Sequence, residues 1–271
     1  MANNELQEKL TQMLGWFHAY CTEHDLRYYL IGGTMLGAAR HQGFIPWDDD
    51  VDVGMPRRDY EKLIALMKDD VGEYRLESPR QYTGKIIASY AKLYHTGTTM
   101  IEESIYNLKK GIYIDVFPLD GAGQTREDGI QHYQPIVFWD NILAIRVCTV
   151  RKGRSFVKNA AAVAGKILPI SIGWLIQKLD SMCASRDFDQ CEYVGNLMSV
   201  YRKKEIMPKA IYGEPTIYRF EGLQVCGVEN ADGYLTHVYG DWRQLPPEEK
   251  RVSLHTHVYM NLNESYLDES Y

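Results

Sequence analysis

Apolar and polar residues alternate with a helical period at the start of the chain. In the segment ELQEKLTQMLGWFHAYCTEHDLRY, apolar side chains recur at three- and four-residue steps, the spacing of one helix face: Leu6, Leu10, Met13, Leu14, Phe17 and Cys21. This pattern predicts an amphipathic helix whose apolar face packs on a core.

The pattern then changes to that of a strand followed by a second helix. The short apolar run from Tyr28 to Ile31 ends at Gly32 and Gly33, and the following TMLGAARHQG suits a short helix closed by Gly43. The sequence therefore predicts a strand, a glycine turn and a helix in succession.

Aspartates crowd the next stretch, IPWDDDVDVGM, and the residues alternate from Trp47 to Val53. In an extended segment one face carries the carboxylates of Asp48, Asp50 and Asp52, whereas Asp49 points to the opposite face with two valines. Carboxylates packed this closely repel one another, so a fold tolerates them mainly where cations or solvent offset the charge. We expect the three carboxylates to converge while the valines enter the core and Trp47 packs beneath the strand.

A second alternating run, GIYIDVF, places Asp115 within an apolar strand. A helix is expected from about Arg58 to Lys68, and strand-like runs follow it. Helices interspersed with strands of this kind predict an α+β fold.

The chain divides by composition into three parts. We expect residues 1–125 to form a core, residues 126–192 a mainly helical insertion or subdomain, and residues 193–271 a C-terminal part that completes the core and its site. In the insertion, the run NAAAVAGKILPISIGWLIQKL contains interruptions, so its apolar stretches fall short of the ~20 residues that span a membrane. A buried or interfacial helix is expected there.

Composition excludes several classes of protein. The chain of 271 residues has a formal net charge of -6, which argues against broad nucleic-acid binding because that needs a basic surface. Its polar start, MANNELQEKL, lacks the features of a secretory signal, so a cytoplasmic location is expected. The five cysteines are odd in number, widely spaced and without a CxxC pair, which favours reduced thiols over disulfides or a zinc cluster.

The aspartates and the glycine turn together suit phosphoryl transfer. That reaction needs carboxylates that hold cations and backbone N–H groups that cradle phosphates. Asp50 and Asp52 could point at one pair of metal ions, while the turn Gly32-Gly33-Thr34 opens a helix whose N-terminus favours anions. Asp115 is the best candidate for a third carboxylate, which would complete the metal site and accept the proton of an attacking hydroxyl.

The longer string GGTMLGAARHQGFIPWDDDVDVGM resembles the signature of the LicD family, which includes the fukutin-related proteins and belongs to the nucleotidyltransferase-fold superfamily. Two further blocks carry the resemblance: GIYIDVFPLD and FEGLQVCGVENADGYLTHVYGDWRQLPPEEKR. The resemblance implies a nucleotidyltransferase-like mixed sheet flanked by helices in the core. It covers most of the chain outside residues 130–199.

The resemblance also implies a function. It implies metal-dependent transfer of phosphocholine, or another phospho-alcohol, from a CDP-activated donor to a sugar hydroxyl of a cell-surface glycan or lipid-linked precursor, with CMP as the leaving group. The cofactor would be Mg²⁺ or Mn²⁺. The family's acidic motif falls on Asp48, Asp50 and Asp52, and its hydrophobic-Asp-hydrophobic strand falls on Asp115, the candidate base.

Two basic residues are candidates for contacts with the donor. Arg40 could aim its guanidinium at the donor phosphates or at the aspartates, because its planar fork suits both. Lys92, on a strand-like segment, is a candidate phosphate contact.

The C-terminal part holds four weaker candidates. Lys250 and Arg251 could bind a phosphate or nucleotide, although a solvated turn explains them equally well. His255 and His257 share one face of an extended segment, but no third ligand stands at a recognisable spacing. A hydrogen-bonding or substrate role is therefore preferred to metal binding.

Two further features leave the ligand and the partner open. The 20 tyrosines invite a site for the quaternary ammonium of choline, but the sequence does not say which aromatics converge. A basic stretch is typical of a solvated face, yet beside an apolar helix it could contact anionic lipid at the inner face of a membrane: Arg146, Arg151, Lys152, Arg154 and Lys158.

Two alternative functions also remain. A nucleotidyltransferase would release pyrophosphate, and a non-catalytic relative would bind glycan or choline without turnover. The acceptor sugar and the oligomeric state are not encoded in these patterns.

Overall fold

The computed structural model describes residues 2–81, 88–102, 106–148, 156–167, 169–252 and 257–268. Its α-helices are α1 (Ala2–Glu23), α2 (Gly32–His41), α3 (Arg57–Leu66), α4 (Arg126–Val147), α5 (Phe156–Ile167), α6 (Ile172–Cys183), α7 (Lys209–Tyr212) and α8 (Ala231–Tyr239). Its 3₁₀ helices are η1 (Pro79–Gln81), η2 (Arg202–Glu205) and η3 (Glu248–Lys250). Its strands are β1 (Tyr29–Leu30), β2 (Asp52–Pro56), β3 (Tyr74–Glu77), β4 (Ala91–His95), β5 (Thr99–Glu102), β6 (Lys109–Lys110), β7 (Tyr113–Gly123), β8 (Tyr193–Gly195), β9 (Met207–Pro208), β10 (Thr216–Phe220), β11 (Leu223–Gly227) and β12 (His257–Asn261).

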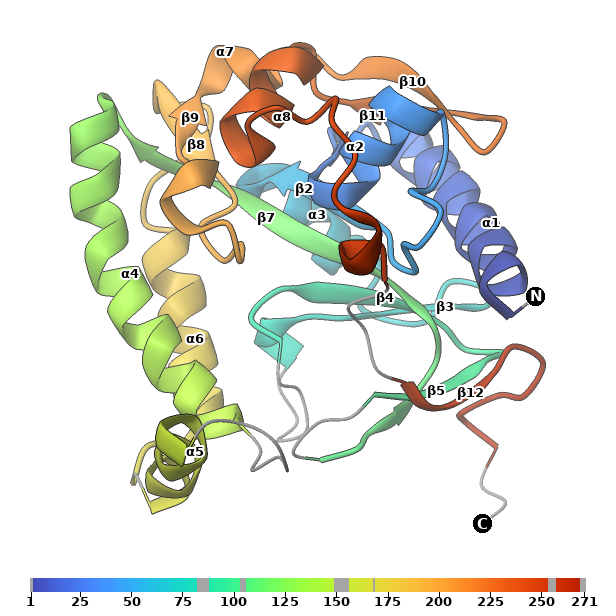
Figure 1. Cartoon of the computed structure of the whole chain (residues 1–271), viewed down its shortest axis with the longest axis horizontal. Coiled ribbons are helices and arrows are strands. Elements are labelled where there is room, and N and C mark those ends of the chain that lie inside the picture. The colour runs from blue at the N-terminus through green and yellow to red at the C-terminus, as the bar shows by residue number, and fades with distance from the viewer. Residues whose placement is uncertain are drawn as a thin grey trace.

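A mixed sheet with helices around it forms the centre of the molecule (Figure 1). Its main path runs β10-β11-β1-β2-β7-β4-β3, and β8 and β9 extend it from the far end of β7. The pairs β1–β11 and β2–β7 are parallel, whereas the other pairs of this sheet are antiparallel. The prediction of an α+β fold with a mixed sheet flanked by helices is confirmed.

The amphipathic first helix is also confirmed. All the apolar residues expected on its inner face are buried in α1: Leu6, Leu10, Met13, Leu14, Phe17 and Cys21. The strand, turn and helix that follow are β1 and α2, but α2 ends differently from the prediction. Gln42, not Gly43, takes the left-handed conformation (φ 58°) that closes the helix.

The aspartate-rich stretch is extended over a shorter range than expected. Strand β2 begins at Asp52 and not at Trp47, because the Asp48 N–H closes a turn by donating to the Ile45 carbonyl at 2.8 Å. Val51 and Val53 are buried in the core, and Trp47 packs against it, as predicted.

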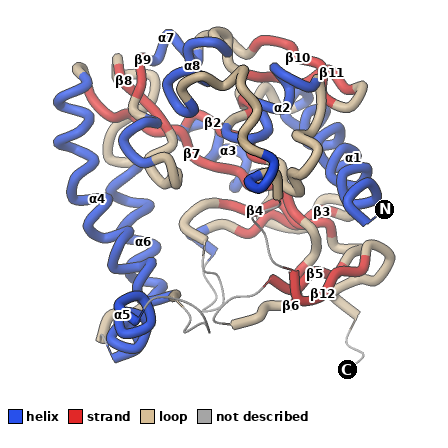
Figure 2. The backbone as a smooth tube through the Cα atoms, in the orientation of Figure 1, coloured by secondary structure: helices blue, strands red, loops and turns tan. Residues whose placement is uncertain are grey.

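Helices α4 and α6 lie side by side and project from the sheet as an arm, with α5 at its end (Figure 2). This arm has a smaller core of its own, built from residues of both long helices: Tyr133, Ile136, Leu143, Leu175, Ile176 and Leu179. The long apolar run divides into α5 and α6. Among the helices that the structure describes, none has the length and apolar character needed to cross a membrane.

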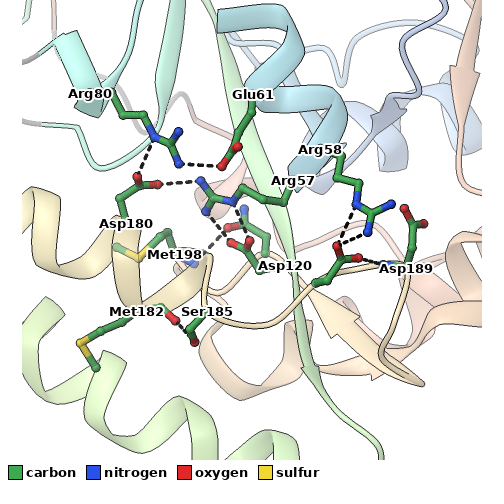
Figure 3. A network of polar contacts seen from close by, with 12 residues as sticks. Arg57, Arg58, Glu61, Arg80, Asp120, Asp180, Met182, Ser185, Asp189 and Met198 are labelled. Carbon is green, nitrogen blue, oxygen red and sulfur yellow. Dashed lines mark hydrogen bonds and ion pairs between the residues drawn. The ribbon is translucent and has the colours of Figure 1, made fainter.

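A buried ion network joins the arm to the sheet (Figure 3). Arg57, at the start of α3, donates from Nε and Nη2 to the two carboxylate oxygens of Asp120 on β7, both at 2.7 Å. Its Nη1 donates to Asp180 on α6, also at 2.7 Å. All three side chains are buried, so this network fixes α6 against β7.

The C-terminal part returns to the main sheet. Strand β8 pairs with β7, and the β10–β11 hairpin extends the sheet beyond β1. Strand β12 pairs with β5 in a separate three-stranded sheet, β12-β5-β6. All five cysteines are free thiols, as predicted.

Candidate active site

A cavity of about 390 Å³ opens beside the adjoining strands β2 and β7. The start of α2 borders it, and a loop after β8 forms another part of its wall. The cavity is lined by carboxylates from three places in the chain: the aspartate-rich stretch (Asp48, Asp50 and Asp52), β7 (Asp115) and η2 (Glu205). The structure thus brings together the four aspartates singled out in the sequence.

Strand register places the charged side chains in a row across three strands. Asp52 on β2 lies opposite Asp115 on β7, because the two strands are parallel and the Asp115 N–H donates to the Val51 carbonyl at 2.9 Å. On the other side of β7, Lys92 of β4 lies opposite Asp115. Its Nζ donates to Asp115 Oδ1 at 2.7 Å, so Lys92 holds a carboxylate where the sequence suggested a phosphate contact.

The glycine turn lets these carboxylates lie against the first turn of α2. Gly32 has a φ of +55°, and a Cβ atom there would lie 3.0 Å from Asp52 Oδ2. A Cβ atom on Gly33 would lie 2.9 Å from Asp48 Oδ2. Side chains at either position would therefore crowd the aspartates, which explains the need for glycine.

Polar groups of α2 and α8 already occupy part of the expected phosphate cradle. The Gly32 N–H donates to the Tyr234 hydroxyl at 3.0 Å. This amide, which the sequence suggested for a phosphate, therefore has a partner within the protein. Thr34 is buried and its hydroxyl accepts a hydrogen bond from the Asp52 N–H at 2.8 Å. Thr34 thus positions the strand that carries Asp52. It is not one of the described residues that line the cavity.

The electrostatics of the cluster favour a positive partner. Burial raises the pKa of Asp52 well above its ordinary value, and the neighbouring charges of Asp50, Asp115 and Asp48 raise it further. Burial also raises the pKa of Asp115, against the opposing effect of Lys92. Either a proton or a cation in the cavity would relieve this accumulation of negative charge.

The oxygen donors of the cluster suit Mg²⁺ or Mn²⁺. Within the described residues, no three acidic, histidine or cysteine side chains form a ready-made metal cage. Mg²⁺ usually keeps several waters and binds through one or two carboxylates plus substrate phosphates, so it does not require such a cage. The residues present therefore fit a metal that binds together with its substrate.

The basic residues predicted at the site lie elsewhere. Arg40 is at the end of α2, where its guanidinium donates to the Trp242 carbonyl and to His41, both at 3.0 Å. Lys250 is exposed in η3, and Arg251 donates to the Pro246 carbonyl at 2.9 Å. The described wall of the cavity contains none of these three residues, so their substrate contacts stay predictions.

His257, one of the two predicted histidines, is also not among the described residues that line the aspartate cavity. His257 lies on β12, and its Nε2 is 3.1 Å from Oδ2 of Asp49. Asp49 faces away from the cavity that Asp48, Asp50 and Asp52 line, which agrees with its opposite face in the sequence pattern. His255 lies outside the described residues.

Sequence reasoning missed one whole wall of the cavity. The loop after β8 contributes Asn196, Ser199 and Tyr201, and η2 contributes Glu205. Tyr90 and Phe117 also line the cavity, with ring centroids 4.1 Å apart. The two-residue spacing of Tyr90, just before β4, and Lys92, on β4, is a sequence signal for a shared face, whereas the loop has no periodic pattern.

Similarity to known proteins agrees with this geometry. Residues 25–144 match the family described as LicD/FKTN/FKRP, nucleotidyltransferase domain. Over 257 residues the chain is 29% identical to the lipopolysaccharide cholinephosphotransferase LicD of Haemophilus influenzae, covering 93% of this chain and 95% of that protein. The chain thus resembles LicD-family proteins, through the family domain at residues 25–144 and through similarity to LicD over most of its length.

Other relatives match a shorter part of this chain. The human ribitol 5-phosphate transferase FKRP is 25% identical over 118 residues, which cover 44% of this chain and 22% of FKRP. The mannosyltransferase regulator 4 of Saccharomyces cerevisiae is 24% identical over 134 residues, or 48% of this chain and 11% of that protein. The resemblance to LicD and fukutin-related proteins inferred from the motifs is confirmed.

Proposed function

We propose that this protein transfers a phospho-alcohol, phosphocholine in the first instance, from a CDP-activated donor to a sugar hydroxyl of a glycan. CMP would be released, and Mg²⁺ or Mn²⁺ would be required. The proposal is supported by the near full-length similarity to a lipopolysaccharide cholinephosphotransferase. Similarity to a ribitol 5-phosphate transferase supports the broader reaction class, transfer of a phospho-alcohol.

The single observation that carries the proposal is the position of Asp52 directly opposite Asp115 in a cavity that Asp48 and Asp50 also line. These oxygens would hold a divalent cation, which when bound supplies positive charge to the donor phosphates and lowers the pKa of the acceptor hydroxyl. A cavity of about 390 Å³ is large enough for a substrate of this class.

The chain's own residues then have distinct tasks. Transfer forms a bond between the acceptor oxygen and the phosphorus of the phospho-alcohol, and it breaks the bond from that phosphorus to the oxygen that leaves with CMP. Asp115, whose pKa burial raises, is the candidate to accept the acceptor's proton before it passes to solvent. Lys92 orients Asp115 through its 2.7 Å hydrogen bond.

The location and the acceptor follow from the same proposal. An enzyme that uses a CDP-activated donor would act in the cytoplasm, with a glycan or a lipid-linked glycan as its acceptor. A lipid-linked acceptor would bring the protein to the inner face of the membrane.

The test is release of CMP from a panel of CDP-alcohols, with CDP-choline first, in the presence and absence of Mg²⁺ or Mn²⁺. We expect metal-dependent release by the wild type and a loss of about 1000-fold in Asp50→Ala, because a ligand that stabilises transition-state charge is removed. Asp69→Ala is the control, since Asp69 is an exposed aspartate outside the cavity.

Two outcomes would reject the proposal. Release of pyrophosphate from a nucleoside triphosphate, without CMP release from any CDP-alcohol, would indicate a nucleotidyltransferase. Ligand binding that needs no metal, without any turnover when glycan acceptors are supplied, would indicate a non-catalytic relative.

A further inference from the structure

The cavity contains a buried acidic side chain that the proposed reaction does not use. Glu205, at the end of η2, is 1% exposed and forms part of the cavity wall. The Ser199 hydroxyl donates to Glu205 Oε1 at 2.9 Å. Oε2 has no hydrogen-bond donor among the described residues, and a buried carboxylate oxygen without a partner is unfavourable.

The wall around Glu205 is held in place by its own hydrogen bonds. Asn196 Oδ1 accepts from the Met198 N–H at 3.0 Å, and Ser199 Oγ accepts from the Tyr201 N–H at 3.1 Å. The Ser199 hydroxyl also donates to Glu205, so this one hydroxyl holds both the Glu205 carboxylate and the backbone N–H of Tyr201. The wall is therefore formed before a ligand arrives.

An aromatic ring lines the cavity next to this acid. The Tyr201 hydroxyl donates to the Tyr239 hydroxyl at 2.9 Å, and the two rings meet edge to face with centroids 5.1 Å apart. This contact fixes the orientation of the Tyr201 ring in the wall. Two more buried tyrosines are near Glu205, since burial and then the Glu205 carboxylate raise the pKa of Tyr212 and Tyr234.

We propose that Glu205 and Tyr201 bind the quaternary ammonium group of the donor alcohol, an inference that rests on the proposed function and names the part of the site that selects choline. A trimethylammonium group carries a positive charge but has no N–H to donate. It therefore suits a carboxylate oxygen that lacks a donor, and an aromatic ring attracts it through the ring's negative face. The remaining cavity then places the phosphates near the aspartates.

The burial of Glu205 links binding of the ammonium group to release of a proton from this carboxyl. It raises the pKa of Glu205 to about 7, against a hydrogen bond from Ser199 that lowers it. A cation at Oε2 would favour the ionised form, so binding would displace the proton that the carboxyl carries at and below neutral pH.

The test compares two ligands of the same shape and different charge. CDP-choline carries the trimethylammonium group, whereas the CDP ester of 3,3-dimethylbutanol carries an uncharged tert-butyl group in its place. Binding of each is measured by calorimetry with Mg²⁺ and without acceptor. We expect the wild type to prefer CDP-choline by about tenfold, the size of a desolvated cation–π and charge contact.

Three variants assign that preference to the two residues. Glu205→Gln keeps the shape and the bond to Ser199, and it should abolish most of the preference. Tyr201→Leu should weaken binding of CDP-choline, whereas Tyr201→Phe, which keeps the ring, should retain it. Affinity for CDP alone shows that each variant is folded, because CDP has no alcohol group.

The inference is overturned if the wild type binds both esters equally, or if Glu205→Gln leaves the preference unchanged. It is also overturned if CMP is released from an uncharged CDP-polyol such as CDP-ribitol but not from CDP-choline, because Glu205 Oε2 would then accept from a hydroxyl. In that case the proposed transfer reaction would stand. The proposed reaction fails separately, through absence of CMP release from every donor, whatever the binding preference.

Discussion

Asp115 and Asp120 lie on the same strand, β7, and both are buried, but their partners differ. Asp120 accepts two hydrogen bonds from Arg57, which also binds Asp180, and none of these three residues is among the described lining of the aspartate cavity (Figure 3). Asp115 accepts from Lys92 and lies opposite another aspartate, Asp52, on the wall of a cavity.

The two clusters respond differently to burial. Burial alone would lower the pKa of Arg57, but the carboxylates of Asp120 and Asp180 outweigh it and raise that pKa, so the guanidinium stays charged. At the other cluster burial and neighbouring carboxylates both raise the pKa of Asp52. A buried ion network that is closed holds two parts of a fold together, whereas one that accumulates a single charge beside a cavity indicates a ligand of opposite charge.

The largest effect on stability is expected at the network of Arg57, Asp120 and Asp180. Arg57→Met leaves the buried carboxylate of Asp120 without its cation and leaves Asp180 with Arg80 alone, so it should lower the free energy of unfolding by about 3–5 kcal/mol. Arg58→Met is the matched control, because Arg58 is exposed and its pair with Asp187 is solvated; it should change stability by less than about 1 kcal/mol. Urea denaturation measures both, and equal losses would show that the Arg57 network does not stabilise the fold.

Local patterns predicted the parts of the site that lie on regular elements. The helical face of α1 and the alternation around Asp115 depend on periodicity, which sequence carries directly. The convergence of Asp48, Asp50 and Asp52 was predicted for one face of a strand, although the strand begins only at Asp52. The turn at Asp48 preserves the convergence, because the glycines of α2 leave space for the carboxylates.

Features that depend on long-range packing were not predictable in this way. Arg40 is inside the motif, yet its guanidinium turns toward the Trp242 carbonyl, a partner far along the chain. The pairing of Arg57 with Asp180 likewise depends on where α6 docks. The loop that carries Tyr201 has no periodic signal, and it reaches the cavity only because β8 pairs with β7.

Glu205 is another buried carboxyl, and its effect on stability should depend on pH. Its pKa is about 7 in the folded protein against 4.5 for an ordinary glutamate, so between these values the folded state holds a proton that the unfolded state has released. Stability from this group is complete below pH 4.5 and is lost as the pH rises to about 7, by about 3 kcal/mol in total.

Glu205→Gln does not titrate and should remove this dependence. The difference in unfolding free energy between the variant and the wild type is measured by urea denaturation from pH 4.5 to 8. We expect the variant to gain relative stability as the pH rises. Parallel curves for the two proteins would show that Glu205 does not change its protonation on folding in this range.

The smallest effect on stability is expected at Lys92, whose ammonium group pairs with Asp115. Lys92→Met should cost about 2 kcal/mol of stability without metal, since a hydrogen bond to a buried charged group is lost. Mg²⁺ bound by the aspartates would replace part of the missing positive charge, so saturating Mg²⁺ should stabilise the variant more than the wild type.

Lys110→Met is the matched control, because Lys110 also pairs with a carboxylate, that of Glu77, and lies 5.6 Å from the centroid of the Tyr94 ring, but outside the cavity. Thermal unfolding with and without Mg²⁺ separates the two cases. If Mg²⁺ shifts both variants and the wild type equally, the cation does not bind next to Asp115. A larger shift in Lys92→Met alone would mean that lysine and metal neutralise the same carboxylates, which is the property that distinguishes this cluster from the one closed by Arg57.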